Sequence, residues 1–193
     1  RAVLPAIVNA YYEDVPKDKI IIDKSRGWNN AHFLGDYSEY VDELPSIVFL
    51  YRPVEEIFKS FANLLDESHR EDFYAKSLEP QSTIQVCVNQ LLQALRFDSD
   101  CYRFVTYANF VENFTKEFAD ICTFFAIPDF SVDPERLSNF QKEPETTQGF
   151  KNLHRVRDGV SRQNIDIELP EHVLSFCHAA NEQIELALNE VKR

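Results

Sequence analysis

The chain has 193 residues, of which 44% are hydrophobic, and its net charge is −12. This size supports a core, so we expect residues 1–193 to form a single domain. The acidic balance argues against general nucleic-acid binding, which needs a cationic face. No apolar run approaches the roughly 18 residues that span a bilayer, so no membrane span is expected. A local cationic pocket remains compatible with this charge.

The four cysteines are widely spaced and form neither a CxxC motif nor a Cys/His ligand cluster. A disulfide scaffold is not expected in a chain of this length, and buried free thiols in a reducing, cytoplasmic compartment are the default. No metal site is predicted. The sequence begins at Arg1 and contains no methionine. The N-terminus is incomplete, or omitted methionines conceal gaps in the spacing, or methionine is absent by chance.

Hydrophobic periodicity predicts the elements of the first part of the chain. A helix is expected over residues 2–13 and a short buried strand over residues 19–23. A helix with a break near Gly35 is expected over residues 31–44. Residues 47–51 are apolar and β-rich, which predicts a strand, and an amphipathic helix is expected over residues 53–66.

The second part begins with a polar stretch, residues 68–82, which is expected to be a loop or lid. A helix with one broad apolar face is predicted over residues 83–96, and a strand over residues 102–107. Asn109 is the expected N-cap of a helix that runs to about residue 125. The last helix is expected over residues 170–191. Strands separated by helices predict a helix-rich α/β fold with a parallel sheet.

The junction at Arg52 is the strongest functional signal. Arg52 follows the predicted strand directly, and Pro53 suits the first turn of the helix after it. Open α/β sheets hold anionic ligands where a strand ends beside a helix N-terminus. Ser60 follows about two turns later. The alternative is a structural arginine that pairs with Glu55 or Glu56 in the first helical turn.

Two further groups carry weaker signals near the first predicted strand. Lys24 and Arg26 lie in the loop after that strand, so they belong to the same sheet edge as Arg52 and suit an anionic ligand. The alternative is a solvated turn. His32 could be a general base near neutral pH, or a histidine with no catalytic role.

A basic island interrupts the polar segment over residues 133–162. It comprises Lys151, His154, Arg155, Arg157 and Gly159. Arg155 and Arg157 alternate, so an extended chain places both on one side, where they could close over a phosphate. The alternative is a surface loop that balances nearby acids.

Taken together, Arg52, Pro53 and Ser60 resemble the 3′-phosphate-binding segment of sulfotransferases that use 3′-phosphoadenosine 5′-phosphosulfate (PAPS). In that family the proline more often lies two residues after the arginine. Three further segments are similar to family motifs in the right order, so that the resemblance spans most of residues 19–160. These segments are residues 20–28, residues 103–128 and residues 152–157.

The resemblance implies a three-layer sandwich like that of P-loop NTPases. It also implies transfer of a sulfonate group from PAPS to a hydroxyl or amine acceptor, without a metal. The family's first strand and 5′-phosphosulfate loop would precede Arg1, so we expect the chain alone to be inactive. Lys24 would lie near the transferring sulfonate, and His32 is a candidate base. Cofactor binding falls to Arg52, Ser60, Arg155, Arg157 and Gly159.

Two other functions share these features. A P-loop nucleotide or small-molecule kinase would use the same sheet and arginines, and would need a GxxxxGK[ST] loop and Mg²⁺ ligands. A non-catalytic nucleotide-binding module of the same fold is the other alternative. The expected partners are the nucleotide co-substrate and an acceptor that the sequence does not identify. The sequence does not indicate an oligomeric state.

Overall fold

The computed structural model describes residues 10, 13–14, 16, 22, 31–38, 44–97, 100–128, 130–136 and 159–191. Most of the helix predicted over residues 2–13 and of the strand predicted over residues 19–23 lies outside these ranges. Ile22 belongs to the predicted buried strand, yet it is 73% exposed and lies in no strand. The prediction of a buried strand is therefore wrong at this position.

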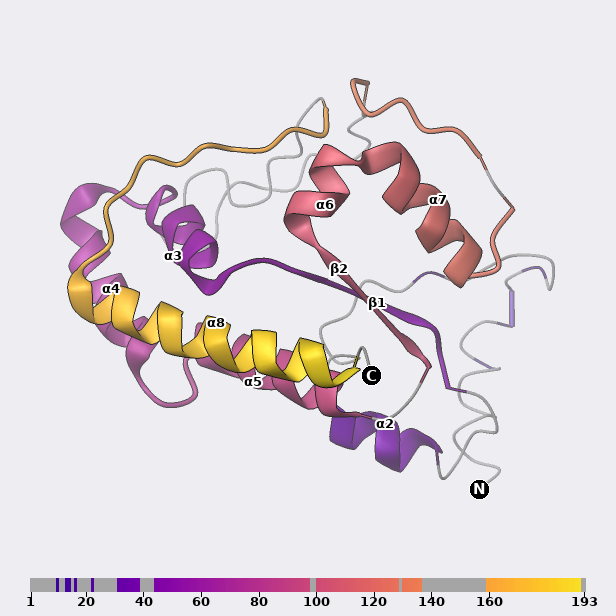
Figure 1. Ribbon diagram of the computed structural model, residues 1–193, viewed down its shortest axis with the longest axis horizontal. Helices are drawn as coiled ribbons and strands as arrows, with labels where there is room; N and C mark the ends of the chain where they lie inside the picture. The colour runs from indigo at the N-terminus through magenta and orange to yellow at the C-terminus, as the bar shows by residue number, and fades with distance from the viewer. Residues whose placement is uncertain are drawn as a thin grey trace.

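Two parallel strands, β1 (Ile47–Tyr51) and β2 (Tyr102–Thr106), pair in register from Ile47 opposite Tyr102 to Tyr51 opposite Thr106 (Figure 1). Both strands were predicted at these positions. Parallel strands need a long crossover, and the chain supplies it with helices. The described residues thus form a mixed α/β fold with a two-stranded parallel sheet among helices.

The crossover contains α3 (Val54–Ala62), the 3₁₀ turn η2 (Glu67–His69), α4 (Arg70–Leu78) and α5 (Thr83–Arg96). The prediction of a loop or lid over residues 68–82 is wrong, because α4 occupies most of it.

Helix α4 is held by a few strong contacts rather than by a clear apolar stripe. The rings of Phe73 and Tyr74 lie 5.9 and 6.4 Å from that of Phe58 on α3, and Arg70 Nε donates to the Ala62 carbonyl at 3.1 Å. Tertiary packing therefore overrides the polar composition of this segment.

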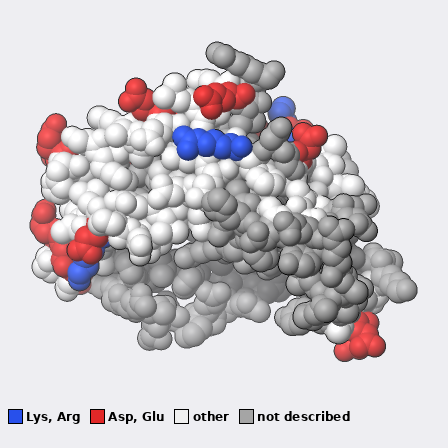
Figure 2. Space-filling view, turned by 90° about the horizontal axis from the view of Figure 1, so that it is seen from below, with Lys and Arg blue, Asp and Glu red and all other residues white. Residues whose placement is uncertain are grey.

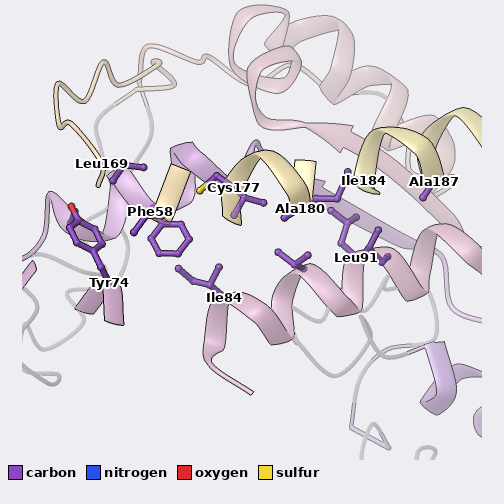
Figure 3. Packing of buried hydrophobic residues seen from close by; sticks show 14 of the residues in the cluster. Phe58, Tyr74, Ile84, Leu91, Leu169, Cys177, Ala180, Ile184 and Ala187 are labelled. Atoms are coloured by element: carbon purple, nitrogen blue, oxygen red, sulfur yellow. The ribbon is translucent and has the colours of Figure 1, made fainter. Parts of the chain in front are cut away.

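The main core lies where α8 (Glu171–Val191) packs on α3 and α5 (Figure 3). The broad apolar face predicted for α5 is largely confirmed, and α8 adds its own buried apolar residues to this core. Leu186 is 60% exposed while Ala187 is buried, and Cys87 is exposed. The fully buried side chains of this core are Val54, Phe58, Ala62, Val173 and Cys177.

After β2 the chain forms two helices, α6 (Tyr107–Glu112) and α7 (Phe114–Phe124), instead of the one predicted. Thr106 is the N-cap of α6, because its hydroxyl accepts the Asn109 N–H at 3.1 Å. The prediction of Asn109 as the cap is therefore wrong. Arg103 on β2 donates to Asp120 at 3.3 Å, which ties α7 to the strand.

Helix α2 (Ala31–Ser38) packs at the starts of the two strands. Its Leu34 is 0% exposed and clusters with Ile47 and Tyr102, the first residues of β1 and β2. The helix continues through Gly35, so the predicted break there is wrong.

Charged side chains of both signs are spread thinly over the described part of the face in Figure 2, where acidic ones lie mostly near the rim. None of the helices that the structure describes combines the length and the apolar composition that a membrane span requires. The four cysteines are free thiols, and only Cys122 and Cys177 are buried. The expectation of buried thiols is thus wrong for Cys87 and Cys101.

Burial of Cys177 predicts a loss of stability at alkaline pH. Burial raises the pKa of its thiol from 9.0 to about 11, so the folded chain keeps a proton that the unfolded chain loses. The free energy of unfolding should be unaffected below pH 9 and then fall by roughly 2–3 kcal/mol as the pH rises to about 11. Urea unfolding at pH 8 and pH 10.5 measures this change. Between these two pH values, Cys177→Val should lose less free energy of unfolding than the wild type or the exposed-site control Cys87→Val. Equal losses in all three would contradict this assignment.

Candidate functional site

An open cavity of about 1080 Å³ lies at the carboxyl end of the two parallel strands. The end of β1, α3 as far as Ser60, the start of α6 and part of residues 160–170 line it. Arg52 and Ser60, which were predicted to share one anion site, both line this cavity. Its volume is sufficient for a nucleotide-sized ligand.

Strand register explains where Arg52 lies. Tyr51 and Thr106 are the last paired residues of β1 and β2, so Arg52 and Tyr107 come next at the same edge. The guanidinium carbon of Arg52 lies 5.7 Å from the centre of the Tyr107 ring. A cation over an aromatic face is favourable, and this contact orients the arginine beside the cavity.

The N-terminus of α3 is capped from a distant part of the chain. Pro53 provides no side-chain cap, and its carbonyl accepts the N–H groups of Glu56 and Ile57 at 3.0 and 3.3 Å. The Val54 N–H donates to Asn181 Oδ1 on α8 at 2.9 Å. One backbone donor that a helix N-terminus offers to an anion is therefore already occupied, so side chains must carry more of the binding.

Three cationic and two anionic side chains line the cavity, in a chain that is acidic as a whole. Lys59 Nζ lies 2.7 Å from Glu55 Oε1, and this hydrogen bond raises the pKa of the Lys59 ammonium. Glu56 accepts from Arg162 at 3.0 Å. Each of these glutamates thus has a cationic partner other than Arg52, and the alternative pairing of Arg52 with one of them stays a prediction.

Residues 160–170, here called the strap, run in extended form from beside α6 toward α8 (Figure 1). The Val160 N–H donates to the Pro134 carbonyl at 2.7 Å, and Leu169 is buried in the main core at 7% exposure. Between these two anchors the strap lines the cavity with four side chains. They are Arg162, Gln163, Asn164 and Ile165.

The structure describes only part of the other predicted site residues. Lys24, Arg155 and Arg157 lie outside the described residues. His32 belongs to α2, which packs at the opposite end of the strands from Arg52, and its side chain is outside the described part of the structure. Gly159 packs against Pro134, where a Cβ atom would lie 3.1 Å from the carbonyl oxygen.

Several residues that line the cavity were not among those predicted from the sequence, and three of them bear on the site: Tyr107, Lys59 and Arg162. Tyr107 could have been found, because β1 and β2 end at the same edge of the sheet, where Tyr107 and Arg52 are the next residues. Lys59 could also have been found, since it precedes Ser60 on the same helix. Arg162 carries no comparable signal, because an irregular segment has no periodicity to indicate its direction.

Among the described residues, no group of three or more His, Cys, Asp or Glu side chains is arranged to hold a metal ion. Comparison of the chain with protein-family models, with curated proteins and with solved structures gave no match. Any function assigned to the chain therefore rests on the geometry and charge of the cavity, together with the resemblance of the sequence motifs.

Proposed function

We propose that the cavity binds the 3′-phosphate of PAPS and that the protein is a sulfotransferase. The observation that carries this proposal is that Arg52 and Ser60 line one cavity at the carboxyl end of two parallel strands. An arginine fork and a hydroxyl together suit a phosphate group. In this proposal the two-stranded α/β core is part of a larger, P-loop-like sandwich, which is the fold that the sequence motifs imply.

In the proposed reaction, an acceptor oxygen or nitrogen forms a bond to the sulfur of PAPS. The bond from that sulfur to the 5′-phosphate oxygen breaks, and adenosine 3′,5′-bisphosphate leaves. The acceptor's proton passes to a base that is not assigned. Arg52 and Ser60 hold the 3′-phosphate and so fix the nucleotide, and catalysis rests on positioning and neutralisation of charge. The roles of Lys24, Arg155, Arg157 and Gly159 remain predictions.

Calorimetric titration of the chain tests the proposal. Adenosine 3′,5′-bisphosphate should bind at least about tenfold more tightly than adenosine 5′-monophosphate, because only the former offers a 3′-phosphate to charged hydrogen bonds. No binding of the bisphosphate at millimolar concentration would overturn the proposal. Tighter binding of ATP with Mg²⁺ would instead favour the kinase alternative.

A further inference from the structure

Arg162 connects the two helices that come after the two strands. Its Nη1 donates to Glu112 Oε1 on α6 at 2.8 Å, and its Nη2 donates to Glu56 Oε1 on α3 at 3.0 Å. The strap thus crosses the cavity with its beginning, two residues after Val160, attached to both sides of the sheet edge. Between the Val160 and Leu169 anchors, these two ion pairs hold the guanidinium at the cavity wall.

The two ion pairs are of a kind that a ligand can displace. The side chain of Arg162 is 51% exposed, and those of Glu56 and Glu112 are 33% and 52% exposed. Exposed pairs contribute little to stability and are screened by salt. Each terminal nitrogen of Arg162 is bound to a different carboxylate. A phosphate can instead accept two parallel hydrogen bonds from one guanidinium, and neither resting pair has this geometry.

We propose that Arg162 is a further anion-binding residue of the cavity, held by Glu56 and Glu112 when the site is empty and released to the phosphate when the nucleotide binds. This inference rests on the proposed function. A phosphate dianion carries more charge than one carboxylate and offers both acceptors to the same arginine. Because Arg162 lies only two residues after the Val160 anchor, its guanidinium turns from the two carboxylates to the phosphate while both anchors of the strap stay in place.

Two single substitutions should have opposite effects on binding of adenosine 3′,5′-bisphosphate. Arg162→Gln should weaken it about three- to tenfold. The variant loses a charged hydrogen bond to the phosphate, but part of this loss is offset because the ion pairs with Glu56 and Glu112 no longer have to break. Glu112→Gln should tighten it about two- to fivefold, because one competitor for the guanidinium is removed. High salt should reduce this gain, since it also screens the resting pairs.

A double-mutant cycle separates release of Arg162 from a general change of charge. Glu55→Gln is the matched control, because Glu55 lines the same cavity but pairs with Lys59. In the Arg162→Gln background the gain from Glu112→Gln should vanish, whereas any gain from Glu55→Gln should persist. If Glu112→Gln increases the affinity equally in both backgrounds, the inference is overturned. Glu112 would then act only through the electrostatic repulsion of its carboxylate on the ligand.

Hydrogen exchange without ligand provides an independent readout. In the Glu56→Gln/Glu112→Gln variant the amides of residues 161–165 should exchange faster than in the wild type, and those of α8 should not change. If exchange is unchanged while the wild type still binds the bisphosphate, Arg162 is not held as proposed, but the proposed function stands. Absence of any bisphosphate binding by the wild type overturns both.

Discussion

Replacing Arg52 by methionine should weaken binding of adenosine 3′,5′-bisphosphate by about 10- to 150-fold. This range corresponds to the roughly 1.5–3 kcal/mol that a charged hydrogen bond contributes. Methionine keeps a long apolar side chain beside the Tyr107 ring but removes the charge and all five donors. The measurement is calorimetric titration of both chains at the same ionic strength, because phosphate contacts depend on salt.

The controls distinguish a lost phosphate contact from a damaged fold. Arg96→Met replaces an exposed arginine on α5 that does not line the cavity, and it should bind like the wild type. Arg52→Met should also bring the affinity for the bisphosphate close to that for adenosine 5′-monophosphate. If its preference for the bisphosphate is unchanged, Arg52 does not hold the 3′-phosphate.

Phe58→Ala should have the largest effect on stability, about 3–5 kcal/mol in the free energy of unfolding. Phe58 is 0% exposed, and its ring lies 6.1 Å from that of Phe176 on α8 and 5.9 Å from that of Phe73 on α4. Alanine leaves a cavity where three helices meet, and these helices cannot all close around it. Urea unfolding followed by far-ultraviolet circular dichroism measures the loss.

Two variants keep this prediction testable if Phe58→Ala does not fold. Phe58→Leu retains most of the volume and should cost roughly 1.5 kcal/mol or less. Phe130→Ala removes the same group from a side chain that is 52% exposed, and should cost less than about 1 kcal/mol. Similar losses for Phe130→Ala and Phe58→Ala would contradict the position of the core.

The elements with strong local signals were predicted well. The continuous apolar run of β1 and the broad apolar face of α5 each specify one secondary structure, and both form within the predicted ranges. Helix α4 could not be predicted in this way. Its stability comes from Phe73 and Tyr74, which pack on Phe58 in another helix, and such distant contacts leave no period in the sequence.

In the candidate site, the residues next to a strand end were the predictable ones. Arg52 and Ser60 lie on a strand–helix unit of fixed geometry, so their approach to one cavity could be predicted. The contacts of Arg162 with α3 and α6 depend on how an extended segment crosses the sheet edge, which no local pattern encodes. The same limit explains why Asn181 was not expected to cap α3.

The hydrogen bond between Asn181 and Val54 joins residues that are 127 positions apart. During synthesis at about 5–20 residues per second, roughly 6–25 s pass between the two. In that interval the first turn of α3 lacks its cap, and the apolar face of the helix lacks the α8 side chains that cover it. The helix that follows Arg52 therefore reaches its final packing late in synthesis. Until α8 docks, the apolar face of α3 around Phe58 lacks the cover that Phe176 provides in the folded chain, and exposed apolar surface of this kind favours aggregation.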